Sequence, residues 1–280
     1  ERLNMAFELA TQFLPYVDEQ FKAESKRQVI TNNDFEFTGA HSVKVYKVTT
    51  SAMNDYDREG TGANHSRYGQ IQGLDATTEE FTLKKDRSFT FALDKLDVDE
   101  TKAALQAAAA LARQLREVVI PEVDTYVYGK VVAGAGTTET GALTDKNVYD
   151  AILKATEVLD TAEVPETNRV LLVTPDTYTI MKKNASIVMA TDVGQDMRKL
   201  GVIGMLDGAT IIKVPKIRLP EDVNFVLVHP SATVAPVKLE DYKIHKDPPG
   251  ISGNLVEGRI AYDAFVLENK TKGIYVHKAK

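Results

Sequence analysis

Histidines are the residues of this sequence that could most directly hold a metal ion or move a proton. A helical zinc site needs two histidines four residues apart on one face, and no pair in the chain has that spacing. We therefore expect no metal site and predict that the histidines lie at the surface or at strand edges. The five are His41, His65, His229, His245 and His277.

Two further patterns match catalytic or binding motifs only in part. The stretch 134–136 has two glycines in the manner of a phosphate loop but lacks the Lys-Ser/Thr ending, so a hinge is the favoured interpretation. Asp97, Asp99 and Glu100 could form an acid/base pair. They stand where a helix is expected to begin, however, and the helix dipole favours negative charge there. Helix capping is therefore the favoured role of these carboxylates.

A short basic cluster is the remaining candidate. Lys84, Lys85 and Arg87 surround Asp86. The pattern allows a phosphate site, but a solvated tight turn between two strands is favoured. The sequence therefore assigns no catalytic, cofactor-binding or metal-binding residue, and we expect neither a cofactor nor enzymatic activity.

Composition excludes several classes of protein. The formal net charge is -6, from 34 basic and 40 acidic residues, without a run of five or six like charges, which argues against a sequence-reading nucleic-acid binder. Cysteine is absent, so disulfides and thiolate chemistry are excluded. No apolar stretch approaches the roughly 20 residues that span a bilayer, so no membrane partner is expected. No signal peptide is expected, and residues upstream of Glu1 are expected to have been removed or to lie outside this sequence.

The first third of the chain has little that could form a compact core. Residues 1–37 mix a short apolar stripe with polar residues and are predicted to form an arm. Strands are predicted at 42–50 and within 81–93, because β-branched and aromatic residues alternate there. Between them, 51–75 is rich in Asn, Asp, Gly and Thr. This long loop has little to bury, and loops longer than about 12 to 15 residues in compact domains tend to be functional or disordered.

The strongest helix signal covers 97–128. Asp97 is the predicted N-cap, and an Ala- and Leu-rich run follows it. Pro121 lacks a backbone donor and should kink or interrupt the helix, although a helical pattern resumes beyond it. A narrow apolar stripe is predicted to face a sheet. Its members are Leu105, Ala108, Ala112, Leu115 and Val119.

Beyond a boundary marked by Gly134, Gly136 and Gly141, the sequence changes to an α/β texture. Thr144 is predicted to cap a helix, and Thr174 with Pro175 is predicted to start another. Asp207 and Gly208 form the most specific hairpin signal in the chain. The buried face of the first helix is predicted as Val148, Ile152, Ala155 and Leu159. Strands are predicted at 170–173, 202–206, 209–214, 225–228, 234–244, 259–267 and 273–277.

An ordered series of short motifs resembles the major capsid proteins of tailed bacteriophages, from about Phe37 to the end of the chain. The motifs are 86–91 (DRSFTF), 93–94 (LD), 97–101 (DVDET), 121–124 (PEVD), 247–253 (DPPGISG), 257–263 (EGRIAYD) and 273–277 (GIYVH). The resemblance implies an α+β fold, the capsid fold of a Hong Kong phage that herpesvirus shells and encapsulin compartments share. The implied parts are an N-terminal arm (1–37), an extended β-hairpin loop (38–94), a peripheral domain with a long spine helix (95–146), an α/β axial domain (147–236) and return strands of the peripheral domain (237–280).

The function that the resemblance implies is self-assembly. The chain would form hexamers and pentamers of an icosahedral head shell that encloses double-stranded DNA without reading its sequence. Further partners would be a scaffolding protein, a portal and minor capsid or decoration proteins. The protein would be assembled in the host cytoplasm and would reside in the virion. No catalytic role is implied.

Two alternatives remain open at this point. One is the shell protein of a cellular encapsulin-type nanocompartment that encloses protein cargo, and the other is an α/β enzyme, which the texture of the second half suggests. Some members of the resembled family join a loop lysine covalently to an asparagine of a neighbour. This chain has no lysine from Val48 to Leu83, so we expect no such bond at the tip of its loop.

Overall fold

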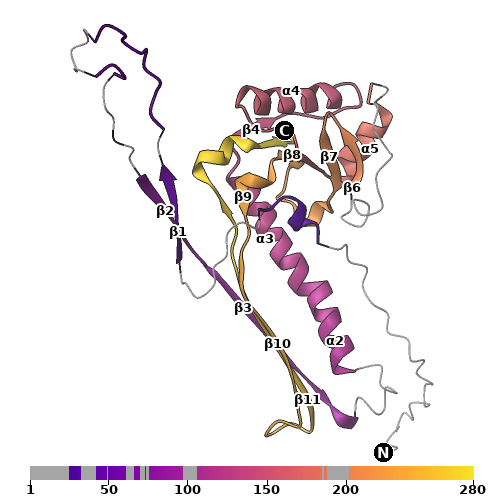
Figure 1. Cartoon of the computed structure of the whole chain (residues 1–280). Coiled ribbons are helices and arrows are strands. Elements are labelled where there is room, and N and C mark those ends of the chain that lie inside the picture. The colour runs from indigo at the N-terminus through magenta and orange to yellow at the C-terminus, as the bar shows by residue number, and fades with distance from the viewer. Residues whose placement is uncertain are drawn as a thin grey trace, which may run out of the picture. The chain divides into compact units, whose positions relative to one another are not determined.

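The structure, a computed structural model, describes residues 25–32, 42–48, 50–60, 66–69, 73, 76–96, 106–184, 186–187 and 202–280 (Figure 1). These residues belong to two compact units. The smaller unit is Phe37–Leu83, and the larger unit contains the remaining described residues. Each unit is described separately below. In the part of the chain that the structure describes, none of the helices is long and apolar enough to cross a membrane.

The smaller unit is an antiparallel β-hairpin, which we call the hairpin unit. Its strands are β1, Ser42–Val48, and β2, Ala76–Thr82. The register places Ser42 opposite Thr82 and Val48 opposite Ala76, so the two strands match over their whole length. A two-stranded sheet is marginally stable by itself, since only one partner supplies hydrogen bonds and packing. The hairpin unit therefore depends on other contacts for its rigidity.

The expected loop 38–94 differs from the structure at its C-terminal end. Strand β3, Lys85–Asp94, pairs with β11, Gly253–Tyr262, and not with β1. Alternating aromatic residues identify a strand but do not identify its partner, because that partner lies about 170 positions away in the sequence. The predicted tight turn at Lys84–Arg87 was wrong for the same reason, since β3 begins at Lys85.

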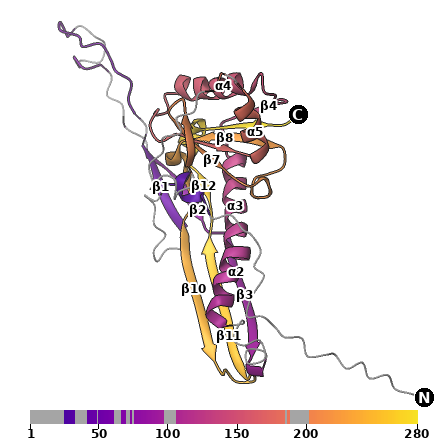
Figure 2. The same ribbon diagram turned by 90° about the vertical axis from the view of Figure 1, so that its right-hand side faces the viewer.

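The larger unit contains a long three-stranded antiparallel sheet in the order β10-β11-β3, where β10 is Val237–Lys246. The buried residues of β11 that lie on one face are Val256, Ile260 and Tyr262. Gly258 lies between them, and a Cβ atom there would come within 2.4 Å of the Phe89 ring. The sheet runs alongside a long helix in both views (Figures 1 and 2).

That helix is the predicted spine helix, and the prediction of a long helix is confirmed for its described part. It consists of α2 (Ala107–Gln114), a π-helical turn (Leu115–Val119) and α3 (Ile120–Ala133). In the π-turn, the Ile120 N–H bonds to the Leu115 carbonyl, five residues back. This wider turn accommodates Pro121, which has no backbone N–H to donate, so the helix continues instead of being interrupted. The predicted start at Asp97 lies outside the described residues.

The predicted apolar stripe of the spine helix was wrong at Ala108 and Ala112, whereas Val119 packs against the core as predicted. Ala107 and Ala110 are buried, whereas Ala108 and Ala112 are exposed. Alanines occupy almost every position of this stretch, so the sequence does not mark which side faces the sheet. Beyond Pro121, the buried face is clear from larger residues. It consists of Val123, Asp124, Val127, Tyr128, Val131 and Val132.

A six-stranded mixed sheet forms the second half, in the order β4-β13-β8-β5-β7-β6. Its strands are β4 (Thr137–Thr140), β5 (Val170–Val173), β6 (Val202–Leu206), β7 (Ala209–Lys213), β8 (Val223–Val228) and β13 (Ile274–Lys278). Both faces are buried. Val170 and Leu172 pack in one core with the spine helix, while Leu171 and Val173 pack in a second core with α4 (Val148–Thr161) and α5 (Pro175–Lys183).

Most local predictions in this half are confirmed. The buried face of α4 is the predicted one. Thr174 caps α5, because its side chain accepts a hydrogen bond from the Thr177 N–H. Asp207 and Gly208 have φ angles of 47° and 74°, as a two-residue hairpin turn between β6 and β7 requires.

The cap of α4 differs from the prediction. Asn147 is the N-cap residue, and Thr144 donates its N–H and its hydroxyl to the Asn147 side-chain oxygen, at 2.7 and 3.0 Å. The remaining short elements connect the sheets. They are β9 (Thr233–Val234), β12 (Phe265–Val266) and 3₁₀ turns at Arg27–Val29, Lys216–Arg218, Pro230–Ala232 and Glu268–Gly273.

Candidate assembly surfaces

The segment 25–32, within the predicted arm, packs against the rest of the larger unit. Ile30 is fully buried in the core that contains the spine helix. The Asn32 N–H donates to the Thr233 carbonyl at 2.7 Å. The Lys26 ammonium donates to the Lys213 carbonyl at 3.1 Å, at the end of β7. This segment therefore connects the spine helix with the six-stranded sheet.

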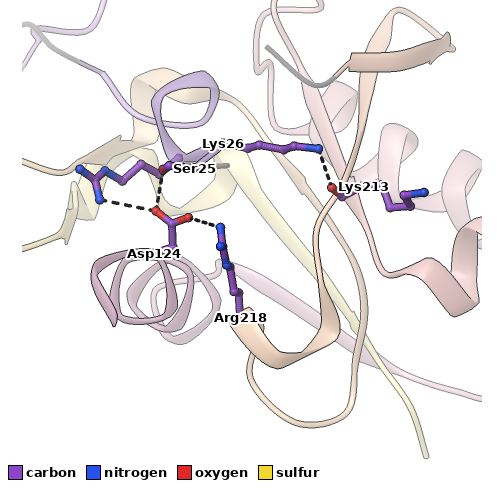
Figure 3. A network of polar contacts seen from close by, with 6 residues as sticks. Ser25, Lys26, Asp124, Lys213 and Arg218 are labelled. Atoms are coloured by element: carbon purple, nitrogen blue, oxygen red, sulfur yellow. Dashed lines mark hydrogen bonds and ion pairs between the residues drawn. The ribbon is translucent and has the colours of Figure 1, made fainter. Parts of the chain in front are cut away.

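A buried carboxylate lies at the centre of this contact (Figure 3). Asp124, on the spine helix, accepts hydrogen bonds from the Ser25 hydroxyl at 2.7 Å and from Arg218 Nη1 at 2.8 Å. Arg27 Nη1 lies 3.5 Å from the same carboxylate. Asp124 is fully buried, and Arg218 is 4% exposed. Three parts of the chain thus meet at one charged group.

Burial dominates the electrostatics of this cluster. It raises the pKa of Asp124, while Ser25, Arg27 and Arg218 act in the opposite direction. Burial, followed by the neighbouring Asp124 charge, also raises the pKa of Tyr128. A buried carboxylate is tolerated only when it is paired and hydrogen-bonded, so the two arginines hold this aspartate in place. Sequence reasoning missed the site, although an aspartate in the apolar series Val123, Val127 and Val131 was a usable signal.

A second buried carboxylate fixes the start of the long C-terminal part of the larger unit. Asp263 is 1% exposed and accepts hydrogen bonds from the Lys84 N–H at 2.9 Å, the Tyr126 hydroxyl at 2.7 Å and the Ala264 N–H at 2.8 Å. Within the larger unit, Asp263 thus links residue 84 to the spine helix, which carries Tyr126.

The described part of the loop beyond β1 carries an exposed aromatic pair. The rings of Tyr56 and Tyr68 are 5.1 Å apart in an edge-to-face arrangement, and both side chains are exposed. The Asp57 carboxylate accepts hydrogen bonds from the N–H groups of Glu59 and Gly60, which closes a turn between them. Met53 is 99% exposed. An organised loop with exposed apolar side chains has the character of a contact surface.

The predicted basic cluster at the start of β3 does not converge on one site. Arg87 pairs with Glu122 of the spine helix at 2.7 Å. Asp86 points to Arg259, whose Nε lies 2.9 Å from it, and the hydrogen bond from Arg259 lowers the pKa of Asp86. Asp86 and Arg259 form a cross-strand pair, and Arg87 and Glu122 form a separate strand-to-helix pair. The phosphate site is therefore not supported.

The histidines differ among themselves. His277 was predicted at the surface or at a strand edge, but it is 4% exposed in the interior strand β13, where it contacts the Asn224 side chain at 3.1 Å. Burial lowers the pKa of His277 and of His229. His245 lies 3.2 Å from Glu257 on an exposed face. Among the described residues, no group of three potential metal ligands occurs. The other two histidines lie outside the described residues.

The glycines at 134 and 136 are required by close packing. A Cβ atom at Gly136 would come within 2.6 Å of the Thr271 carbonyl, and one at Gly134 would come equally close to Val266. The Gly136 N–H donates to the Thr271 carbonyl at 2.9 Å, so it is not available to a phosphate. This supports neither a phosphate loop nor a free hinge. The carboxylates of 97–100 lie outside the described residues.

The described residues define a class of structural protein that works through contacts with other chains: a hairpin unit with exposed apolar side chains, and a larger unit with a long sheet beside a spine helix. Comparison with known proteins agrees with this class. Residues 76–276 match the family described as phage capsid protein, which is more than half of the 280 residues. The chain therefore belongs to the phage capsid protein family. It is a structural protein of the virion and not an enzyme, so the α/β enzyme alternative is excluded.

Solved structures share the fold over nearly the whole chain. A structure from Mycobacterium phage Che8 has 20% identity and a TM-score of 0.67, and the match covers 99% of this chain and 98% of that one. The capsid structure of cyanophage P-SCSP1u has 16% identity and a TM-score of 0.73, with 96% and 92% covered. A virus-like particle from Pyrococcus furiosus has 12% identity and a TM-score of 0.53, with 91% and 92% covered. No curated protein matches the sequence.

Proposed function

We propose that this capsid protein is the major subunit of a tailed-phage head shell, in which it forms the hexamers and pentamers of an icosahedral lattice around double-stranded DNA. The observation that carries the proposal is the hairpin unit, a two-stranded sheet with an exposed aromatic pair and an exposed methionine. Such a hairpin gains rigidity and buries its apolar side chains when it lies on another subunit.

Each part of the chain has a proposed role in the lattice. Residues 1–37 are an arm that reaches a neighbour, and the hairpin unit is the extended loop. The spine helix with the three-stranded sheet is the peripheral domain, to which β10 and β11 of the expected return segment 237–280 belong; β13 of that segment lies instead in the six-stranded sheet. Residues 147–236, completed by β4 and β13 of the same sheet, form the axial domain around the hexamer and pentamer axes. Scaffolding, portal and decoration proteins are further proposed partners, and assembly is proposed to take place in the host cytoplasm.

Electron microscopy of assembled particles with a nucleic-acid stain tests this proposal. We expect closed shells that contain packed duplex in particles from infected cells. Shells filled with protein cargo and free of DNA would instead indicate an encapsulin-type nanocompartment, and small open oligomers would contradict a shell of either kind. Each copy should bury well over the roughly 2,000 Å² that is the lower range for obligate interfaces.

DNA should be enclosed without being read. The net charge of -6 provides no excess of basic residues for a sequence-specific footprint. We expect the subunit to bind different duplex sequences equally and weakly at physiological salt, as measured by competition with random DNA. A preference of tenfold or more for one sequence would contradict this expectation.

The shell should be held together without covalent links at the loop tip. Lysine is absent from Val48 to Leu83, and Lys47 at the base pairs with Glu79 at 3.3 Å. An isopeptide bond from the tip therefore lacks its amine. Denaturing electrophoresis of mature particles should show one band near 30.8 kDa, the mass of the chain. A ladder of oligomers that survives boiling in detergent would contradict this prediction.

A further inference from the structure

The two ends of strand β7 carry opposite charges. The strand starts directly after the turn at Asp207 and Gly208, and it ends at Lys213. At about 3.3 Å per residue, these ends are about 20 Å apart. Helix α5 contacts the Lys213 end, and helix α4 lies near the Asp207 end. Figure 1 shows β7 together with these two helices.

The first end is basic and has an exposed apolar residue. The ammonium groups of Lys182 and Lys213 lie 5.6 and 5.5 Å from the centre of the Tyr178 ring, so helix α5 and strand β7 bring two positive charges to one aromatic side chain. Lys216 follows in the next turn, where its ammonium lies 3.6 Å from the exposed Asp176 carboxylate of α5, and Ile217 beside it is 86% exposed. We use the name basic surface for Tyr178, Lys182, Lys213, Lys216 and Ile217.

The second end is an open, shallow groove whose nine lining residues include four carboxylates and one arginine. Leu153 of α4 lies in it and is 38% exposed. Asp160 is paired with the buried Arg169 at 2.7 Å, which fixes the end of α4 against the start of β5. Glu157 and Glu166 also line the groove, as does Asp207 of the turn. We call this lining the acidic groove.

The exposed apolar side chains are also divided between the two ends. Among described residues between 137 and 235, Leu153 and Ile217 are the large hydrophobic side chains that are exposed. One lies in the acidic groove and the other lies in the basic surface. Each end thus offers an exposed apolar side chain beside charges of one predominant sign. Three lysines with Asp176 lie at one end, and four carboxylates with Arg169 lie at the other. A second copy of the chain fits such a pair of surfaces.

A ring of identical subunits requires a contact between two different faces of the subunit. Around a ring axis, the contact is heterologous, so one face of each subunit meets a different face of the next subunit. We infer that the basic surface of one copy docks into the acidic groove of the adjacent copy around the hexamer and pentamer axes, with Ile217 packing on Leu153. This inference rests on the proposed function, because it requires a ring-forming subunit.

Charge reversal tests the inference. One variant carries Lys213→Glu and Lys216→Glu, a second carries Glu157→Lys and Glu166→Lys, and a third carries all four substitutions. Each substitution changes the charge by two, so the variants have net charges of -10, -2 and -6, against -6 for the parent. A control with Lys270→Glu and Lys272→Glu also has a net charge of -10, but its changes lie on the 3₁₀ turn before β13.

Shell yield, measured by sedimentation and microscopy, is the readout. We expect at least a tenfold loss for the first and second variants, recovery to within threefold of the parent for the four-substitution variant, and less than a twofold change for the control. Parental yield from the first two variants, or no recovery in the third, would overturn the inference. A parent and a control that both form no shells would instead show that the proposed function is wrong.

A neutral variant keeps the test independent of folding. Ile217→Ser removes the exposed apolar contact without changing the charge, and an 86% exposed side chain contributes little to the fold of the subunit. We expect an unchanged melting temperature of the unassembled subunit together with a fivefold or larger loss of shells. An unchanged yield of shells from this variant would overturn the inference, even if the charge-reversed chains did not fold.

Discussion

Replacement of Asp124 by alanine should lower the free energy of unfolding of the subunit by about 3–5 kcal/mol, because it breaks a buried ion pair by removing one partner. The other partner is Arg218, which is 4% exposed and lies 2.8 Å from the carboxylate in the native chain. The Ser25 hydroxyl loses its acceptor in the same variant, so the segment 25–32 should also become more accessible to proteases. Urea unfolding of the unassembled subunit measures the effect.

Two comparisons make this prediction specific. Arg87→Ala breaks the exposed pair with Glu122 and should cost no more than about 1 kcal/mol. The double variant Asp124→Leu with Arg218→Met replaces both charges by apolar groups of similar size, and it should recover most of the lost stability. If Asp124→Ala costs no more than Arg87→Ala, the buried pair does not hold the contact of the segment 25–32 together.

Shortening of the hairpin loop should abolish assembly and leave the larger unit folded. Val48 and Ala76 are opposite each other in the register, so an Asn-Gly turn can replace residues 49–75 and join the two strands directly. This variant keeps β1 and β2 but lacks Met53 and the Tyr56–Tyr68 pair. We expect a change in the melting temperature of less than about 3 °C, since less than about 1 kcal/mol is lost from the larger unit. The yield of closed shells should fall by at least 100-fold.

The matched control for this deletion is a conservative change inside the loop. Ala52→Ser alters an exposed residue and keeps the loop length, so this variant should assemble as the parent does. Closed shells formed in normal yield by the shortened chain would show that the loop does not contribute to subunit contacts. A shortened chain that unfolds would instead show that the larger unit depends on the hairpin.

The sequence predicted local features of the second half well, for physical reasons that act over a few residues. The buried face of α4 follows from apolar residues at helical spacing. The turn between β6 and β7 follows from an Asp-Gly pair, which accepts positive φ angles at low cost. The cap of α5 follows from a threonine before a proline. Each of these predictions depends only on residues within the segment concerned.

Features that depend on distant partners could not be predicted in the same way. Strand β3 was assigned to the loop because its alternating pattern does not reveal that its partner is β11. The buried face of α2 was predicted wrongly because alanine occupies most of its positions, so the sequence does not distinguish one side of the helix from another. Asp124 is identifiable as a buried ion-pair partner only once Ser25, Arg27 and Arg218 have been brought together by the fold. The motif order, by contrast, indicated the family from sequence alone, and the family match confirmed it.

The central claim, that this chain builds a closed shell from copies of itself, is tested most directly by size-exclusion chromatography with light scattering on the purified protein. We expect a particle of many subunits, together with an unassembled subunit whose loop 51–75 is cleaved readily by proteases because it lacks a neighbour to cover it. A single monodisperse monomer of 30.8 kDa whose loop resists proteolysis would contradict the claim.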